Sequence, residues 1–181
     1  LPVVMLLATV TGMIQYFAFG SNMNSNLLDR RTGSQGLGPS RPCVLDGYEI
    51  CFDVGSSRFT PAFASVRASP ADHQFVHGAL YELSLVQFLR MLASEGVPLG
   101  PYRVIPVEVQ PYGQSSSQGT RPVRAYTLGS SAAMDSILAF KGKPSTRYKR
   151  LIVEGAEASG LDEDYIDLLR GLETFNLLRQ G

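Results

Sequence analysis

The chain has 181 residues but no tryptophan, only two cysteines and no excess of charge, with 16 Lys and Arg against 16 Asp and Glu. Two cysteines are too few for a disulfide scaffold, so we expect Cys43 and Cys51 to be free thiols. The balanced charge argues against nucleic acid as a partner, because phosphate binding needs surplus basic residues. With 44% hydrophobic residues the chain is not of the disordered type, and its length favours one domain.

The sequence also lacks the short motifs of the common catalytic and cofactor sites. It contains no CxxC pair, no HExxH, no GxSxG elbow, and no GxGxxG or Walker loop. His73 and His77 flank a strand-like run, in which that spacing separates two side chains by about 13 Å. We therefore expect no metal, nucleotide or redox cofactor. The five basic residues between 141 and 150 are typical of a solvated helix face.

The apolar start of the chain, LPVVMLLATV, is too short for a membrane span, which needs about 20 apolar residues. No basic region precedes it, as a secretory signal would require. We expect residues 1–12 to be an extension or a strand, residues 13–172 a single domain, and residues 173–181 a tail. We therefore expect a cytoplasmic protein that does not contact a membrane. A plastid or mitochondrion is the alternative if residues 1–12 remain from a processed targeting segment.

Strand-like sequences come first along the chain, and helix-like sequences gather at its end. Strands are expected at residues 14–19, 43–52, 62–66, 75–83, 102–110 and 121–128. Helices are expected to start within 22–30 and to span residues 85–94, 132–140, 145–154 and 161–172. In the clearest helix, 85–94, Ser84 and Gln87 form a capping box, and Gly96 marks the stop. This order indicates an α+β fold rather than alternating βαβ units.

Three local features have the chemistry of a binding or catalytic site. The first is the segment YFAFGSNM, in which a hydrophobic strand ends in the turn Gly20-Ser21-Asn22 before a helix start. Such a turn exposes successive backbone N–H groups, which suit a carboxylate or a developing oxyanion. Many strand-to-helix turns have this appearance, so the turn alone does not identify a site.

The second feature is Glu95, at the C-terminal end of the helix over residues 85–94. The negative end of the helix dipole disfavours a carboxylate there, and a surface Glu tolerates this whereas a pocket Glu suits proton transfer. The apolar face of this helix is predicted to consist of Leu85, Phe88, Leu89 and Leu92. The third feature is three tyrosines, which either belong to the core or line a polar pocket: Tyr102, Tyr126 and Tyr148.

Together these segments resemble the γ-glutamylcyclotransferases, including the AIG2-like branch, from about residue 14 to residue 172. YFAFGSNM resembles the Y-G-S-N loop of that family, and ASVRASPADHQFVHGALYEL resembles its V-x-G-x-L/V-Y strand. SEGVPLGPYRVIPVEV resembles the E-G-V segment that carries the catalytic acid, here Glu95. RAYTL and TRYKRLIVEGAEASGL resemble the downstream tyrosine segments. The chain departs from the pattern at Phe19, where the family commonly has Tyr, so one substrate contact is in question.

The resemblance implies a small mixed β-barrel flanked by helices. It also implies conversion of a γ-glutamyl amino acid or amine to 5-oxoproline and a free amine, without a cofactor. Glu95 would be the acid/base, and the substrate would be bound by Phe19, Gly20, Ser21, Asn22, Met23, Tyr102, Tyr126 and Tyr148. The partner is a small γ-glutamyl molecule, and a homodimer is left open. Two alternatives keep the fold: a non-catalytic binding or assembly module, and an enzyme for another conjugate such as a γ-glutamyl-lysine isopeptide.

Overall fold

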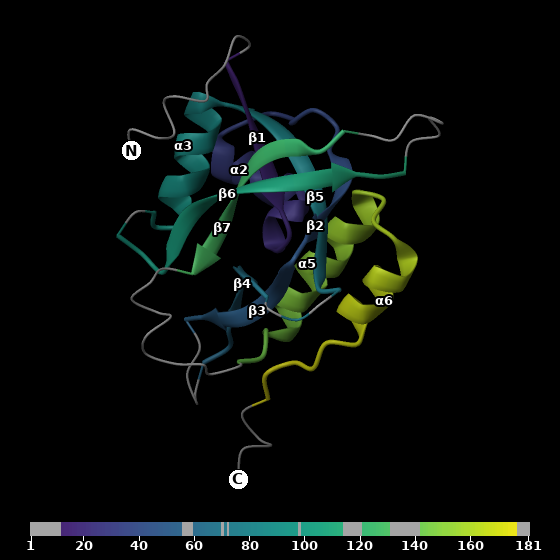
Figure 1. Cartoon of the computed structure of the whole chain (residues 1–181). Coiled ribbons are helices and arrows are strands. Elements are labelled where there is room, and N and C mark those ends of the chain that lie inside the picture. The colour runs from purple at the N-terminus through teal and green to yellow at the C-terminus, as the bar shows by residue number, and fades with distance from the viewer. Residues whose placement is uncertain are drawn as a thin grey trace.

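The computed structural model of the chain describes residues 12–55, 60–69, 71, 73–97, 99–113, 121–130 and 142–176. The helix expected at 132–140 lies outside the described residues, as do residues 1–11 of the expected extension and residues 177–181 of the expected tail. The helices that are described gather around a curved sheet (Figure 1).

In the described residues, seven strands form one sheet with the pairing order β1-β5-β2-β6-β7-β4-β3. The strands are β1 (Met13–Ala18), β2 (Arg41–Asp46), β3 (Tyr48–Val54), β4 (Phe63–Ala68), β5 (Phe75–Ser84), β6 (Tyr102–Pro111) and β7 (Val123–Ser130). A parallel pairing of β1 with β7, at Tyr16 and Tyr126, closes β1, β5, β2, β6 and β7 into a ring. The antiparallel pair β3–β4 extends from the ring through β7. The predicted α+β fold with a small mixed barrel is therefore confirmed.

The prediction of one strand over residues 43–52 is wrong, because the chain turns at Gly47. This glycine has a φ of +74°, a left-handed conformation that side chains disfavour. Its N–H donates to the Gln74 carbonyl oxygen at 2.9 Å and to the side chain of Asp46 at 3.0 Å. The strand before the turn pairs with β5 and β6, whereas the strand after it pairs with β4. The Asp-Gly dipeptide is a turn signal that could have revealed this break from the sequence.

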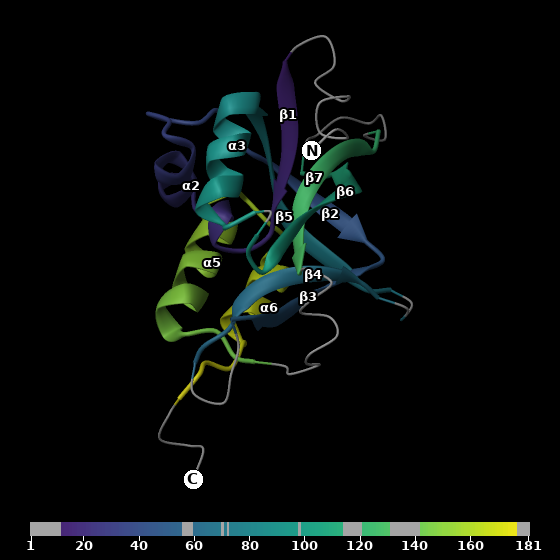
Figure 2. The same ribbon diagram turned by 90° about the vertical axis from the view of Figure 1, so that its left-hand side faces the viewer.

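The helices cover one side of the strands, as the view in Figure 2 shows for α2, α3 and α5. They are the 3₁₀ turn η1 (Ser21–Met23) and the helices α2 (Ser25–Thr32), α3 (Leu85–Ser94), α5 (Thr146–Ala158) and α6 (Glu163–Arg170). None of the described helices combines the length and the apolarity that crossing a membrane requires. The side chains that lie between the helices and the strands form one core, in which Tyr16, Phe17, Met23 and Phe88 are almost fully buried.

Helix α3 has the ends that the sequence predicts. The Ser84 side chain accepts a hydrogen bond from the Gln87 N–H at 3.3 Å, and the Gln87 side chain accepts one from the Ser84 N–H at 2.8 Å. Glu95 is the C-cap residue. The position of the helix end determines the backbone position from which the Glu95 side chain extends.

The buried face of α3 differs from the predicted one. Phe88, Met91 and Leu92 are buried, whereas Leu89 is 44% exposed. Residues three and four positions apart share a helix face, so Glu95 continues the buried stripe one turn beyond Met91 and Leu92. The rotation of this face carries Glu95 toward the interior, where its side chain is only 12% exposed.

Helix α5 holds the 3₁₀ turn η1 in place through a close approach at Gly155. A Cβ at this position would lie 2.6 Å from the backbone nitrogen of Asn24 and 2.7 Å from the carbonyl carbon of Met23. Such distances are too short for any side chain, so only glycine lets the helix reach the loop. The loop that follows β1 is thus pressed between α5 and the sheet.

Candidate active site

A cavity of about 290 Å³ opens where the loop after β1 meets the end of α3, β4 and α5. Seven of the residues predicted from the sequence line it: Phe19, Gly20, Ser21, Asn22, Glu95, Tyr102 and Tyr148. The other lining residues are Tyr16, Arg31, Val54, Gly55, Phe63, Ala64, Ser94, Pro101 and Leu128. Glu95 and the Gly20–Asn22 loop therefore open into one cavity, although 73 positions separate Asn22 from Glu95 in the chain.

The remaining two predicted residues, Met23 and Tyr126, do not line this cavity. Met23 is fully buried in the core, and its carbonyl oxygen accepts a hydrogen bond from the Tyr81 hydroxyl at 2.9 Å. Tyr126 packs against Phe88, with 5.9 Å between the ring centroids. On β7 it is Leu128, two residues further along the same strand face, that reaches the cavity.

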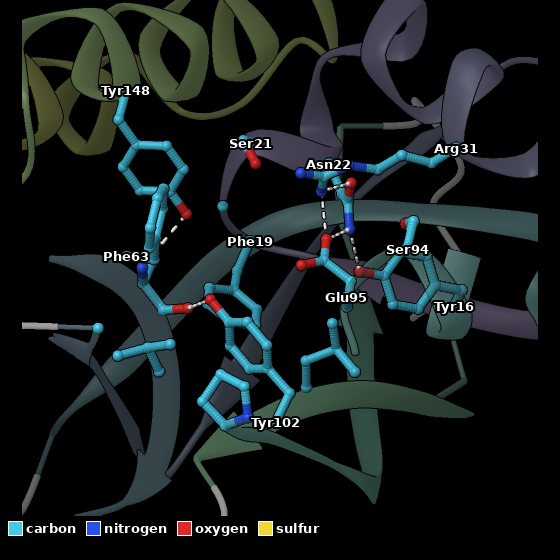
Figure 3. A pocket seen from close by; sticks show the side chains of 16 residues that line it. Tyr16, Phe19, Ser21, Asn22, Arg31, Phe63, Ser94, Glu95, Tyr102 and Tyr148 are labelled. Carbon is cyan, nitrogen blue, oxygen red and sulfur yellow. Dashed lines mark hydrogen bonds and ion pairs between the residues drawn. The ribbon is translucent and has the colours of Figure 1, made fainter. Parts of the chain in front are cut away.

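One side of the cavity, which we call the polar wall, consists of Tyr16, Asn22, Arg31 and Glu95 (Figure 3). The Arg31 guanidinium forms an ion pair with Oε1 of Glu95. Asn22 connects the other three side chains. Its Nδ2 donates to the Tyr16 hydroxyl at 2.9 Å and to Oε1 of Glu95 at 3.1 Å, and its Oδ1 accepts from Arg31 at 2.6 Å. The four side chains form one hydrogen-bonded network.

The opposite side, which we call the aromatic wall, consists of Phe19, Phe63, Tyr102 and Tyr148 (Figure 3). Both tyrosine hydroxyls bond to the backbone of Ala64 on β4. Tyr102 donates to its carbonyl oxygen at 3.0 Å, and Tyr148 accepts from its N–H at 3.2 Å. The Phe63 ring meets the Tyr148 ring edge-on, with 5.1 Å between centroids. Phe63 remains 47% exposed, so it lies at the edge of the cavity.

The three tyrosine hydroxyls of the two walls stay protonated at neutral pH. Burial is the main cause that raises the pKa of Tyr16, Tyr102 and Tyr148, and the negative charge of Glu95 raises each pKa further. Hydrogen bonds from Ser21 act in the opposite direction on the pKa of Tyr148. Among the described lining residues, Glu95 is the one carboxylate and Arg31 the one cation. Among these side chains, the carboxylate of Glu95 is thus a candidate proton acceptor, whereas the tyrosines are not.

The loop between β1 and α2 lines the cavity with Gly20, Ser21 and Asn22, at the start of the turn η1. In η1 the N–H of Met23 donates to the Gly20 carbonyl at 3.0 Å, and the N–H of Asn24 donates to the Ser21 carbonyl at 3.1 Å. The first N–H groups of a helical turn have no partner within the turn, which here applies to Ser21 and Asn22. The Tyr148 hydroxyl lies close to Ser21. The cavity thus combines backbone donors, a neutral hydroxyl and one carboxylate.

Sequence reasoning missed Arg31 and Tyr16 as members of the site. Arg31 lies in the last turn of α2, where a basic residue is expected because it interacts favourably with the helix dipole. Tyr16 alternates with Phe17 on β1, and its sequence context predicts only a hydrophobic strand. A signal for both was present in Glu95 itself, because a carboxylate on a buried helix face requires a cation or a donor.

Outside the cavity, His77 has structural contacts. Its ring stacks on Tyr165 with 4.5 Å between centroids, and its Nδ1 bonds to the Tyr112 hydroxyl at 2.8 Å. Within the described part of the chain, no group of three or more His, Cys, Asp or Glu residues is placed to hold a metal ion.

Comparisons with known proteins find similar sequences and similar folds. The model of the AIG2-like family matches residues 75–169. Gamma-glutamylcyclotransferases of Mus musculus and Homo sapiens are each 27% identical over 165 residues, which is 87% of this chain and 78% of each relative. The solved structure of a gamma-glutamyl cyclotransferase is 21% identical with a TM-score of 0.71, over 93% of this chain and 92% of that one. An uncharacterized protein from Homo sapiens is 23% identical with a TM-score of 0.72, over 91% and 90%.

The two solved structures show the same fold, and the family model extends over more than half of the chain. The matches to the curated relatives span most of the chain. The chain therefore belongs to the AIG2-like family.

Proposed function

We propose that this protein converts a γ-glutamyl amino acid or amine to 5-oxoproline and a free amine. The observation that carries the proposal is the meeting of Glu95 with the Gly20–Asn22 loop in one small cavity. The activity named for the mouse and human relatives supports it. A cavity of about 290 Å³ suits a single folded glutamyl group better than an extended peptide.

In this reaction the α-amine of the substrate attacks its own γ-carbonyl carbon. The new C–N bond closes the five-membered ring, and the amide bond to the leaving amine breaks. Holding the glutamyl chain in a bent conformation is a large part of the catalytic task, because it brings the two reacting atoms together. The cavity walls on either side of Glu95 would provide this confinement.

Glu95 would move the proton that the reaction requires. The α-amine is protonated at neutral pH, and the carboxylate takes its proton before or during attack. The protonated acid then gives this proton to the leaving nitrogen. The ring nitrogen loses a second proton after attack, and Glu95 passes it to the released amine, which departs as an ammonium ion, so the side chain ends in its starting state. The tyrosines of the cavity would not compete for the proton, because their raised pKa values keep them neutral.

The backbone N–H groups of the Gly20–Asn22 loop would stabilise the oxyanion of the tetrahedral intermediate. Fixed donors in a partly buried site are effective because they need little reorganisation as the charge develops. The Tyr148 hydroxyl, next to Ser21, is placed to donate to the α-carboxylate of the substrate. The same N–H groups could instead bind the α-carboxylate of the substrate. Each N–H can donate either to the oxyanion or to this carboxylate, but not to both.

The test is product analysis with a panel of γ-glutamyl compounds, including γ-glutamyl-alanine, ε-(γ-glutamyl)-lysine and a γ-glutamylamine. We expect 5-oxoproline and the free amine in equal amounts, detected by mass spectrometry. N-acetyl-γ-glutamyl-alanine is the matched control, which should remain unchanged because its nucleophile is blocked. Release of glutamate in place of 5-oxoproline would indicate a hydrolase, and no product from the whole panel would favour a binding module.

A further inference from the structure

The two oxygens of Glu95 have different surroundings. Arg31 and Asn22 both contact Oε1. Among the residues that the structure describes, none forms a hydrogen bond with Oε2, and Figure 3 shows this second oxygen directed into the cavity. One oxygen is therefore used by the protein, and the other is available to a bound molecule.

We propose that Arg31 is a positioning residue, which keeps Glu95 ionised and turns its Oε2 toward the substrate amine. The inference rests on the proposed function, in which Glu95 must accept a proton. It assigns a role to a side chain on α2 that need not touch the substrate itself. Asn22 is its partner in this task.

The carboxylate of Glu95 lies where the rest of the fold offers its negative charge little support. It lies at the negative end of α3, and its side chain is only 12% exposed. Tyr16, Tyr102 and Tyr148 face it as neutral hydroxyls and provide no positive charge. Arg31 is the cation of the described cavity lining, and an ion pair of this kind is favourable when its remaining polar atoms are satisfied.

Asn22 satisfies part of the pair, leaving Oε2 to the substrate, and fixes its geometry. Its Oδ1 faces the guanidinium of Arg31, and its Nδ2 faces Oε1 of Glu95 and the Tyr16 hydroxyl. The reversed amide would place Oδ1 against the carboxylate and the NH₂ group against the guanidinium, which repel each other. The side chain of Asn22 is thus committed to the network, and its backbone N–H is what remains for the substrate.

The position of Arg31 on α2 connects Glu95, the proposed proton acceptor, with the Gly20–Asn22 loop. Asn24 caps α2 directly after η1 by accepting a hydrogen bond from the Leu27 N–H at 3.1 Å. The loop and Arg31 therefore belong to one continuous unit, and α2 packs against α3, which carries Glu95. A displacement of this unit would move the backbone donors and the orientation of Oε2 together.

The test compares Arg31→Met, which removes the charge, with Arg31→Lys, which keeps it. For Arg31→Met we expect kcat to fall about 10- to 100-fold, less than the full contribution of a general base. The acidic limb of the pH profile of kcat/KM should move to higher pH, because the carboxylate is harder to ionise without the cation. Arg31→Lys should restore the position of this limb and part of kcat. The exposed neighbour Arg30 offers a matched control, and Arg30→Met should change neither.

One result would overturn the proposal: a raised KM for Arg31→Met with kcat and the acidic limb unchanged. Arg31 would then bind the substrate carboxylate directly. A measurement without substrate separates this inference from the proposed function. The carboxyl ¹³C signal of Glu95 should respond to pH at a higher pH in Arg31→Met than in the unmodified protein, whichever substrate is turned over. An unchanged response would contradict the role of Arg31 even in an active enzyme.

Discussion

The two walls of the cavity are built in different ways. In the polar wall, side chains bond to one another, from Tyr16 through Asn22 to Arg31 and Glu95. In the aromatic wall, Tyr102 and Tyr148 bond to backbone atoms of the same residue, Ala64. A network of side chains determines charge and proton affinity, whereas rings anchored to a strand determine shape. We therefore expect substitutions in the polar wall to affect chemistry and those in the aromatic wall to affect binding.

The largest effect should come from the polar wall, with Glu95→Gln. The amide keeps the size and some hydrogen bonds of the side chain but cannot accept the proton, so release of 5-oxoproline should fall by about 10²- to 10⁴-fold. Glu154→Gln, at a half-exposed carboxylate on α5, is the matched control and should be fully active. Circular dichroism should show both variants folded. Turnover by Glu95→Gln within about twofold of the unmodified protein would remove Glu95 from the mechanism.

A smaller effect is expected where α5 supports the loop between the two walls. In Gly155→Ala the added methyl group overlaps the backbone at Met23 and Asn24, and overpacking of this kind lowers the free energy of unfolding by about 1–3 kcal/mol. Alanine also favours the helix by about 1 kcal/mol, which offsets part of the loss. Gly171→Ala is the control, because its Cβ would meet no atom closer than 3.4 Å. Urea denaturation measures the free energy of unfolding of both variants. If Gly155→Ala were as stable as the unmodified protein, the loop would accommodate the added methyl group without cost.

The aromatic wall should respond to Tyr148→Phe with a change in binding. The substitution leaves the Ala64 N–H without its partner and removes a donor near Ser21, so we expect kcat/KM to fall about tenfold, in line with an unsatisfied buried donor. KM should carry most of the change, and the acidic limb of the pH profile should stay in place. A displaced limb would break the distinction between the two walls.

The smallest effect is expected at Phe19, the position where the family commonly has Tyr. Phe19→Tyr adds a hydroxyl to the cavity, and one extra hydrogen bond to the substrate is worth about 0.5–1.5 kcal/mol. KM should therefore decrease by a few fold, with kcat little changed, when steady-state kinetics are measured with γ-glutamyl-alanine. An increase in KM would mean that the aromatic wall uses the apolar ring itself.

Features that depend on neighbouring residues in the sequence could be predicted, and those that depend on distant packing could not. The capping of α3 by Ser84 and Gln87 is local, and it correctly placed Glu95 at the helix end. The pairing of Arg31 with Glu95 joins two helices 64 positions apart, and no periodicity reports it. The exposure of Leu89 likewise depends on which elements cover α3.

The dependence on distant packing also explains why two of the predicted binding residues, Met23 and Tyr126, lie outside the cavity. Met23 follows the loop directly, but the 3₁₀ turn and the approach of Gly155 direct it into the core. Tyr126 lies on the strand face of the cavity residue Leu128, yet the parallel pairing with Tyr16 places it at the closure of the ring. A family pattern can place Met23 and Tyr126 in the fold. Whether they lie close to the cavity depends on the path of the whole chain.

The most direct measurement of the central idea is a crystal structure of the protein with 5-oxoproline bound. We expect the product to lie in the cavity between the two walls. The ring N–H, which was the α-amine, should donate to Oε2 of Glu95, and the ring carbonyl oxygen should face the N–H groups of the Gly20–Asn22 loop. A product seated in this cavity with its ring nitrogen turned away from Glu95, or bound at another place on the molecule, would contradict the account.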